Sequence, residues 1–142
     1  MKSNHILLVE DNDGDILLIT DAINDFQTKT TFSIVKNGKL ALEYLFKIGQ
    51  FENAVHPDII ILDINLPLKN GLEILKLIKK NDFTKIIPVI MFTTSSTKND
   101  ILQSYANYAN AFITKPLEVF DFIESIKSIE KFWLQTVQLP NK

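Results

Sequence analysis

Short, mostly apolar runs alternate along the chain with longer stretches in which apolar residues recur at helical spacing. The runs predict five strands, and the third is an unbroken aliphatic run, which is typical of a strand buried on both faces of a sheet. The predicted strands cover residues 6–9, 32–35, 59–62, 89–92 and 111–113. The stretches between and after them predict helices over residues 16–26, 40–48, 72–78, 101–108 and 118–134.

This strict alternation of strand and helix favours an α/β fold with a parallel sheet, because right-handed crossover connections place helices on both faces of such a sheet. We predict a flavodoxin-like (βα)5 architecture, a doubly wound parallel sheet with strand order 2-1-3-4-5. In that order, ligands bind beyond the carboxyl ends of the strands, at the reversal between strands 1 and 3. The pattern therefore locates the functional site before any motif is considered.

Length and composition narrow the class of protein. With 142 residues, 46% of them hydrophobic, the chain is expected to form a single domain over residues 1–142. The residues after Pro116 suffice for a last helix and a short apolar tail, so no output domain is predicted. A net charge of −2 with scattered lysines disfavours nucleic-acid binding. The absence of cysteine, and of an apolar run long enough for a signal peptide or a membrane span, suits a cytoplasmic protein.

Charged and hydroxylated residues follow four of the predicted strands. Because the carboxyl ends of parallel strands meet at one edge of the sheet, we expect these side chains to converge. An acidic residue after a strand is more often a turn former or a helix cap, and that interpretation is kept for Asp13 and Asp15. The residues expected to converge are, in chain order, Glu10, Asp11, Asp63, Thr93 and Lys115.

Asp63 is the most informative of these residues, because a carboxylate at the end of an aliphatic strand is costly unless a cation neutralises it. Carboxylates on adjacent strand ends also repel one another. A hard divalent ion with oxygen ligands relieves that repulsion, and Mg²⁺ is the common case. Lys115, just before Pro116, can supply a second positive charge, with the hydroxyl of Thr93 nearby. Such an arrangement suits a phosphoryl group on Asp63.

At these positions the chain resembles the receiver domains of two-component response regulators over nearly its whole length. The resemblance rests on four motifs in receiver order, namely LLVEDN, ILDINLPLKNG, PVIMFTTSS and AFITKP. It implies a signalling switch that is phosphorylated on Asp63, rather than an enzyme acting on outside substrates. By the same resemblance, Asp11 binds Mg²⁺ directly and Glu10 binds it through water, while Asp63 and the backbone carbonyl of Asn65 complete the metal site.

The resemblance also implies how the switch works. Thr93 hydrogen-bonds one phosphoryl oxygen and moves towards it, Lys115 pairs with another oxygen, and Phe112 turns inward on the fifth strand. These changes alter the surface formed by the fourth helix, the fifth strand and the fifth helix. A tyrosine is common at the position of Phe112, so this chain keeps the packing change without the hydroxyl. The bond between Lys115 and Pro116 is expected to be cis.

The expected partner is a sensor histidine kinase or a phosphotransfer protein. Two stretches, VKNGKLALEYLF and FTTSSTKNDI, and the apolar tail SIEKFWLQTVQLP are similar to the stand-alone, CheY-like receivers found beside bacterial phytochrome-type kinases. Part of the tail is expected to pack onto the domain. The rest, with the fourth helix, fifth strand and fifth helix, predicts a homodimer or another partner surface.

Three rival classes fail on particular residues. An EF-hand starting at Asp11 would need glycine and glutamate where the chain has Ile16 and Ala22. A phosphatase with an aspartyl nucleophile would favour a second carboxylate where the chain has Asn65. A flavin-binding module would have its phosphate repelled by the loop EDNDGD. The remaining alternative is an interaction scaffold with the receiver fold that is never phosphorylated. The isolated His5 and His56 are interpreted as bystanders.

Overall fold

The computed structural model describes residues 3–140, in which five strands and five α-helices alternate along the chain. The strands are β1 (Asn4–Val9), β2 (Thr30–Val35), β3 (Ile59–Leu62), β4 (Val89–Thr93) and β5 (Ala111–Thr114). The α-helices are α1 (Asp13–Asn24), α2 (Gly38–Leu45), α3 (Gly71–Lys80), α4 (Lys98–Ala106) and α5 (Val119–Ile129). A 3₁₀ turn, η1 (Gly49–Phe51), follows α2, and a π-helix, η2 (Glu130–Thr136), follows α5.

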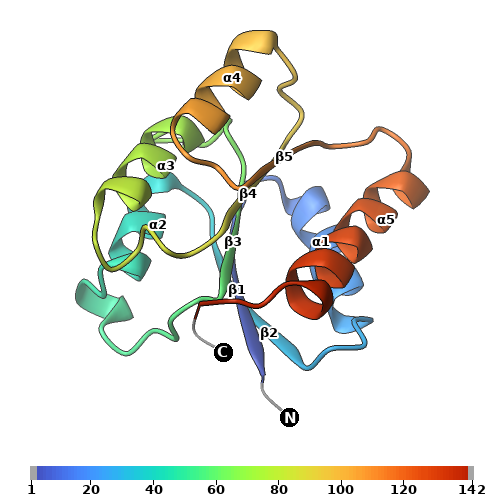
Figure 1. Cartoon of the computed structure of the whole chain (residues 1–142), viewed down its shortest axis with the longest axis horizontal. Coiled ribbons are helices and arrows are strands. Elements are labelled where there is room, and N and C mark those ends of the chain that lie inside the picture. The colour runs from blue at the N-terminus through green and yellow to red at the C-terminus, as the bar shows by residue number, and fades with distance from the viewer. Residues whose placement is uncertain (1–2, 141–142) are drawn as a thin grey trace.

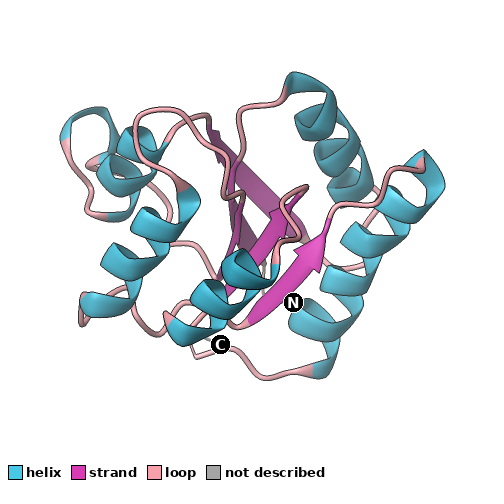
Figure 2. Cartoon of the chain, turned by 90° about the horizontal axis from the view of Figure 1, so that it is seen from above, coloured by secondary structure: helices cyan, strands magenta, loops and turns pink. Residues whose placement is uncertain are grey.

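The five strands form one parallel sheet in the order β2-β1-β3-β4-β5, which confirms the predicted fold class. Figures 1 and 2 show α1 and α5 on one face of the sheet and α2, α3 and α4 on the other. The strand order reverses between β1 and β3, which run side by side with Val9 paired to Leu62. The residues that follow them, Glu10 and Asp63, therefore emerge together at one edge of the sheet.

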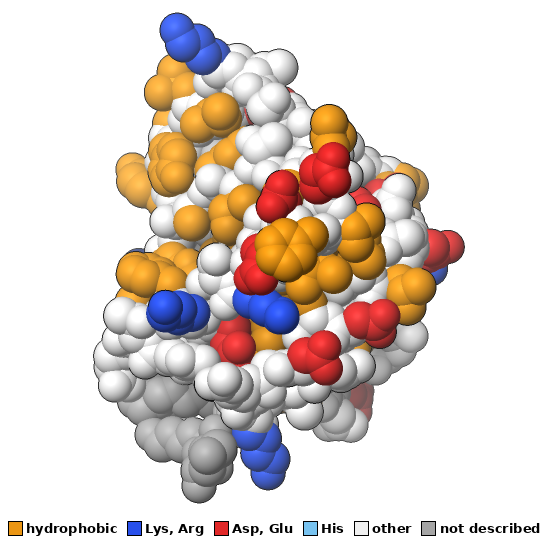
Figure 3. All heavy atoms as spheres, turned by 90° about the vertical axis from the view of Figure 1, so that its right-hand side faces the viewer, with side chains coloured by type: hydrophobic (Ala, Val, Ile, Leu, Met, Phe, Trp, Pro, Cys, Tyr) orange, Lys and Arg blue, Asp and Glu red, His pale blue; other side chains and the backbone are white. Residues whose placement is uncertain are grey.

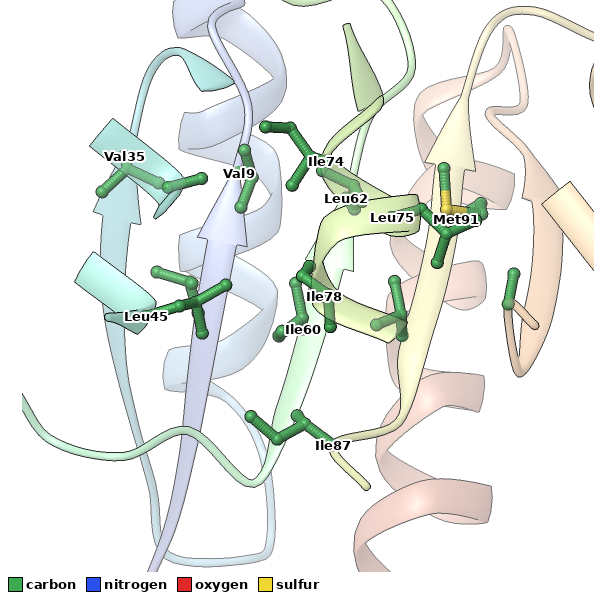
Figure 4. Packing of buried hydrophobic residues seen from close by; sticks show 14 of the residues in the cluster. Val9, Val35, Leu45, Ile60, Leu62, Ile74, Leu75, Ile78, Ile87 and Met91 are labelled. Atoms are coloured by element: carbon green, nitrogen blue, oxygen red, sulfur yellow. The ribbon is translucent and has the colours of Figure 1, made fainter. Parts of the chain in front are cut away.

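Two apolar layers hold the helices against the sheet. In β3, Ile60 and Leu62 face α2 and α3, whereas Ile59 and Ile61 face α1 and α5. Figure 4 shows the first layer, where side chains from the strands meet those of α3. Each fully buried aliphatic side chain of this kind contributes roughly 1.5–3 kcal/mol to folding. Within residues 3–140, no helix is both long and apolar enough to cross a membrane.

Side-chain caps decide where the first four helices begin. An asparagine or threonine before each of α1, α2, α3 and α4 accepts a hydrogen bond from the backbone N–H three residues further along. For α1 this residue is Asn12, whose Oδ1 accepts the N–H of Asp15 at 2.9 Å. The expectation that Asp13 or Asp15 caps the helix is therefore wrong. Both acids lie in its first turn, where negative charge favours the helix dipole.

Gly71 begins α3 at a point where no side chain fits. A Cβ atom there would lie 2.0 Å from the carbonyl oxygen of Asp63 and 2.7 Å from the Cα of Ile64. The N–H of Gly71 donates to the carbonyl of Ile64 at 2.8 Å. The start of α3 thus packs directly onto the backbone that carries Asp63, which explains the glycine in the ILDINLPLKNG motif.

The last helix differs from the prediction. The pattern predicts one helix over residues 118–134, but α5 ends at Ile129 and the chain continues as η2. At the junction the buried carboxylate of Glu130 accepts hydrogen bonds from the N–H and the hydroxyl of Thr28, both at 2.8 Å. This contact ties the first residue of η2 to the connection between α1 and β2. An apolar repeat along the sequence does not report such a change in helical turn.

Most of the apolar tail packs onto the domain. Leu139 is buried, and Trp133, Leu134 and Val137 pack against the layer formed with α1 and α5. Phe132 remains largely exposed. The predicted homodimer surface stays a prediction, with Phe132 as an apolar side chain that it could use. Residues 141–142 of the predicted domain, like residues 1–2, lie outside the described residues.

Candidate functional site

Two buried carboxylates, those of Glu10 and Asp63, lie at the carboxyl ends of the neighbouring strands β1 and β3. The N–H of Glu10 donates to the carbonyl of Val35, and the N–H of Asp63 donates to the carbonyl of Val9, both at 3.1 Å. The hydrogen-bond ladder of the sheet thus continues to both acids and fixes their backbones. The topology thus brings together two side chains that lie far apart in the sequence.

Lys115 reaches across from the end of β5 to both of these acids and to a third. Its own N–H donates to the carbonyl of Thr93 at 2.8 Å, which extends the pairing of β4 and β5. Its Nζ lies 2.5 Å from Glu10 Oε1, 2.8 Å from Asp15 Oδ2 and 3.0 Å from Asp63 Oδ2. The three N–H bonds of the buried ammonium therefore all have charged acceptors.

Burial and the contacts with Lys115 act in opposite directions on the pKa of Glu10, and burial and charged partners do so on that of Lys115. It raises the pKa of Glu10 to about 7, and the hydrogen bond from Lys115 opposes that shift. Burial lowers the pKa of Lys115, but hydrogen bonds to Asp15 and Glu10 and the charge of Asp63 outweigh it, so that this pKa lies above its ordinary value. Lys115 is therefore cationic at neutral pH, and a single ammonium faces three acidic side chains.

Asp11 joins Glu10 and Asp63 in an acidic pocket, in which one oxygen from each of the three carboxylates lies within 4.8 Å of the others. Glu10 is held by the turn, since its Oε2 accepts the N–H groups of Asp11 and Asn12, both at 3.2 Å. Asp63 Oδ1 accepts the N–H of Asn65 at 3.2 Å. Hard divalent cations prefer such oxygen ligands, and the exposed Asp11 leaves the pocket accessible. The residues present therefore fit a divalent metal ion.

Thr93 and Phe112 occupy the two strands beyond the pocket. Thr93 is fully buried at the end of β4, and its hydroxyl accepts the N–H of Ser95 at 3.3 Å. Phe112 is half-buried in β5 against the layer of α2 and α3, and its N–H donates to the hydroxyl of Tyr105 at 3.1 Å. The roles predicted for Thr93 and Phe112 in phosphoryl binding and switching stay predictions.

The sequence pattern did not reveal Asp15 as a member of the site. It indicated a helix-start residue, yet the Asp15 carboxylate is one of the three that contact Lys115. One signal was available, because α1 begins three residues after Glu10 and its first turn therefore lies at the same edge of the sheet. The contact itself joins residues 100 positions apart, which no local pattern reports.

The bond between Lys115 and Pro116 is trans, since no peptide bond among the described residues is cis. The expected cis bond is therefore wrong. The trans form of such bonds is intrinsically preferred by roughly 0.5–1 kcal/mol. From the trans form, the Lys115 side chain already reaches its three acidic partners.

Known proteins similar to this chain point to one family. Residues 6–127 match the family model of the response regulator receiver domain. The response regulator Rcp1 of Synechocystis sp. is 38% identical over 135 residues, which cover 95% of this chain and 92% of that protein. A crystal structure of the phosphorylated cyanobacterial phytochrome response regulator RcpA is 40% identical, with a TM-score of 0.96 over 98% of this chain and 99% of that one. The Mn²⁺-bound form of Rcp1 is 38% identical, with a TM-score of 0.94 over 96% and 99% of the two chains.

The matched region runs from β1 into α5 and contains the acidic pocket and Lys115. The strand order, the position of the pocket beyond the carboxyl ends of β1 and β3, and the family match thus agree. The chain belongs to the response regulator receiver domain family, as the motifs predicted, and it is a phosphoacceptor switch of two-component signalling rather than an enzyme that turns over outside substrates.

Proposed function

We propose that Asp63 accepts the phosphoryl group and that Mg²⁺ is the metal ion which the acidic pocket holds during the transfer. One observation carries this proposal. The buried Asp63 carboxylate lies 3.0 Å from the Lys115 ammonium and is also a member of the acidic pocket with Glu10 and Asp11. Of the three pocket carboxylates, Glu10 and Asp63 contact Lys115. Of these two, Glu10 accepts hydrogen bonds from the turn after β1, and Asp63 does not.

The proposed Mg²⁺ site consists of Asp11, Asp63 and the backbone carbonyl of Asn65, with Glu10 as a ligand through water. Bound there, the ion supplies positive charge to the oxygens of the incoming phosphoryl group. The chain itself contributes the nucleophilic carboxylate of Asp63 and the fixed ammonium of Lys115. The Thr93 hydroxyl accepts the N–H of Ser95, and its own hydrogen is available to donate to a phosphoryl oxygen.

The transfer is a substitution at phosphorus. A carboxylate oxygen of Asp63 forms a bond to phosphorus while the bond from phosphorus to the donor breaks, and the leaving group keeps the electron pair. With a phosphohistidine donor the leaving atom is an imidazole nitrogen, and with acetyl phosphate it is an oxygen of acetate. Lys115 offsets the negative charge that the phosphoryl oxygens bring into the site.

The proposed donor is a sensor histidine kinase of the phytochrome type, or a phosphotransfer protein in the same pathway. The likeness to RcpA, a phytochrome response regulator, supports this assignment. The surface beside the site also suits a protein donor, because a hollow lined in part by Asp15, Lys115 and Leu117 opens there. Leu17, Leu117 and Phe120 are strongly exposed apolar residues. Figure 3 shows apolar side chains gathered among acidic ones on the face of α1 and α5.

The test is an intact-mass measurement after incubation with Mg²⁺ and acetyl phosphate. We expect the wild type to gain the mass of one phosphoryl group and Asp63→Asn to gain none. Asp13→Asn is the matched control, because it removes a carboxylate of the same size that lies on the surface and pairs with Lys36. No mass gain on the wild type, with a donor that labels another receiver, would contradict the proposal and favour the unphosphorylated scaffold.

A further inference from the structure

Asp15 differs from the other two carboxylates around Lys115. Glu10 and Asp63 belong both to the acidic pocket and to the contacts of the ammonium. Asp15 contacts the ammonium at 2.8 Å and is not one of the three pocket carboxylates. Its side chain is 25% exposed, compared with 4% for that of Lys115. The Asp15 carboxylate therefore contacts the ammonium and lies outside the acidic pocket. Glu10 and Asp63 can interact both with the ammonium and with a metal ion in that pocket.

The start of α1 does not account for this contact. Asn12 supplies the side-chain cap, and Asp15 takes part in it through its backbone N–H. In a capping box, the side chain of a glutamate or glutamine at the third position of a helix turns back to the N–H of the capping residue. In this chain that N–H donates to Glu10 Oε2 instead, at 3.2 Å. The carboxylate of Asp15 is thus released from capping and turns to Lys115.

Asp13 shows what an acid in the same turn does without such a contact. Its carboxylate pairs with Lys36 at 2.6 Å, and its side chain is 83% exposed. Asp13 and Asp15 both lie in the first turn of α1, so the helix dipole favours each of them in the same way. The contact with a buried ammonium is what distinguishes Asp15 from Asp13.

The shared oxygens create a conflict between two cations. A metal ion bound by Asp63, and by Glu10 through water, would offset negative charge around Lys115 and place a like charge near it. We propose that Asp15 is a positioning residue that holds Lys115 and offsets its charge, so that the ammonium and Mg²⁺ occupy the site together. This inference deepens the proposed function and rests on it, because it takes the acidic pocket as the Mg²⁺ site.

The proposal predicts what happens when Asp15 loses its charge. Lys115 then depends on Glu10 and Asp63 alone, and Mg²⁺ has to compete with the ammonium for those two carboxylates. The affinity for Mg²⁺ therefore falls. The loss of any nearby negative charge lowers that affinity to some extent as well, and Asp13→Asn measures this general part.

The experiment is a calorimetric titration of the unphosphorylated full chain with Mg²⁺. For Asp15→Asn we expect the dissociation constant to rise roughly five- to tenfold, the size typical of losing one charge of a partly buried cluster. For Asp13→Asn we expect a rise of less than about twofold, as for an exposed and screened charge. An equal rise in the two variants, or no rise in Asp15→Asn, overturns the proposal. Asp15→Ser, which keeps a residue suited to a helix start, repeats the test if the asparagine variant does not fold.

A double-mutant cycle shows whether Asp15 acts through Lys115. In a Lys115→Met background there is no ammonium to hold, so Asp15→Asn is expected to raise the dissociation constant no more than Asp13→Asn does. A full effect of Asp15→Asn in that background would mean that Asp15 attracts or binds the metal directly, and it would overturn the positioning role. Thermal unfolding without metal checks that each variant is folded.

Failure of this inference is distinguishable from failure of the proposed function. If acetyl phosphate labels Asp63 but Asp13→Asn and Asp15→Asn bind Mg²⁺ alike, the inference falls and the phosphoacceptor stands. If Mg²⁺ binding depends on Asp15 but no label appears, the phosphoacceptor falls and the inference stands. A wild type that does not bind Mg²⁺ contradicts both.

Discussion

The two ends of β1 each bury a polar cluster, and the two clusters differ in the amount of charge that they contain. His5 lies near the start of the strand and Glu10 directly follows its end, and both are buried. The ring of His5 contacts hydroxyl groups, whereas the carboxylate of Glu10 contacts an ammonium group that two further carboxylates share. A comparison of the two ends shows which kind of buried polar cluster indicates function.

At the amino end the polar atoms satisfy one another. The Nδ1 of His5 lies 2.6 Å from Thr31 Oγ1, and its Nε2 lies 2.9 Å from Ser33 Oγ and 3.2 Å from the hydroxyl of Tyr44. The N–H of His5 donates to Asp58 Oδ2 at 2.8 Å. Such a network is stable without a ligand, because hydrogen bonds replace those lost to water and the carboxylate of Asp58 is the one acidic group among these partners.

At the carboxyl end the contacts are as short, but they leave charge unbalanced. Three carboxylates surround one ammonium, and the exposed Asp11 adds a fourth acid beside them. Every buried side-chain nitrogen and oxygen within residues 3–140 has a hydrogen-bond partner, so both ends are equally satisfied in that sense. Excess charge of one sign, rather than buried polarity, is therefore the feature that marks the site in this fold.

The largest expected effect comes from a substitution that displaces the backbone beside Asp63, at the carboxyl end of the sheet. In Gly71→Ala the new methyl group would lie 2.0 Å from the carbonyl oxygen of Asp63, so α3 or the loop that carries Asp63 has to move. We expect the free energy of unfolding to fall by roughly 3 kcal/mol and phosphorylation to be impaired. Urea unfolding and the intact-mass measurement report the two effects.

Gly14→Ala is the control for Gly71→Ala. A Cβ atom at Gly14 has its nearest contact 3.3 Å away, at the side-chain oxygen of Asn12, and the position lies in the first turn of a helix. Its effect on the free energy of unfolding is expected to stay within roughly 1 kcal/mol. If Gly71→Ala were as stable and as active as Gly14→Ala, the close packing of α3 against Asp63 would not be what shapes this end.

The outline of the fold was predictable from the sequence, and so was the convergence of Glu10, Asp11, Asp63 and Lys115 at one edge of the sheet. Asp15, the fifth charged residue there, was not expected to join them. An aliphatic run such as residues 59–62 is typical of a strand buried on both faces, and topology then brings Glu10 and Asp63 together. The partners of individual side chains were not predictable. Asp15 meets Lys115, and His5 meets Thr31, through contacts between residues far apart in the chain.

The amino end illustrates the same limit. His5 was interpreted as an isolated bystander because the sequence shows no metal partner for it. Its partners are hydroxyl groups on β2 and α2, which carry no metal-site or catalytic signature. The change to π-helical turns at Glu130 escaped prediction for a related reason, since the hydrogen bonds from Thr28 depend on how the chain folds back.

A smaller effect is expected from removing one hydroxyl group from the polar cluster at the amino end of β1. Tyr44→Phe removes the hydroxyl that donates to the carbonyl of Val55 at 2.6 Å and that also contacts Ser33 and His5. We expect the free energy of unfolding to fall by roughly 1–2 kcal/mol, because partly buried acceptors lose a partner. Mg²⁺ affinity and phosphorylation should remain those of the wild type, since the carboxyl end is untouched.

The control for this change is Tyr108→Phe, which removes a hydroxyl from a tyrosine that is exposed. It is expected to leave the free energy of unfolding unchanged. A loss of Mg²⁺ affinity in Tyr44→Phe would contradict the independence of the two ends, and a loss of stability equal to that of Tyr108→Phe would contradict the importance of the hydrogen bonds.

The smallest expected effect is the pH dependence of stability that His5 causes, and it tests the difference in charge between the two ends. Burial lowers the pKa of His5, and the charge of Asp58 opposes that shift in part. The unfolded chain, in which histidine has its ordinary pKa near 6.5, therefore binds the proton more readily than the folded chain. His5 thus makes the protein less stable as the pH falls from above 6.5 to below it, and this loss is recovered when the pH rises.

Glu10 acts in the opposite direction in the absence of metal. Its pKa is raised to about 7, so the folded chain holds that proton more tightly, and stability is lost as the pH rises through 7.

His5→Gln keeps Glu10 and removes the titrating imidazole, so the stability difference between this variant and the wild type isolates His5. The wild type is expected to lose more stability than His5→Gln between about pH 8 and about pH 5.5 in urea unfolding. His56→Gln, which changes an exposed histidine, should follow the wild type. Equal losses in the wild type and in His5→Gln would mean that the amino end accepts a proton without cost, and charge balance would then no longer distinguish the two ends of β1.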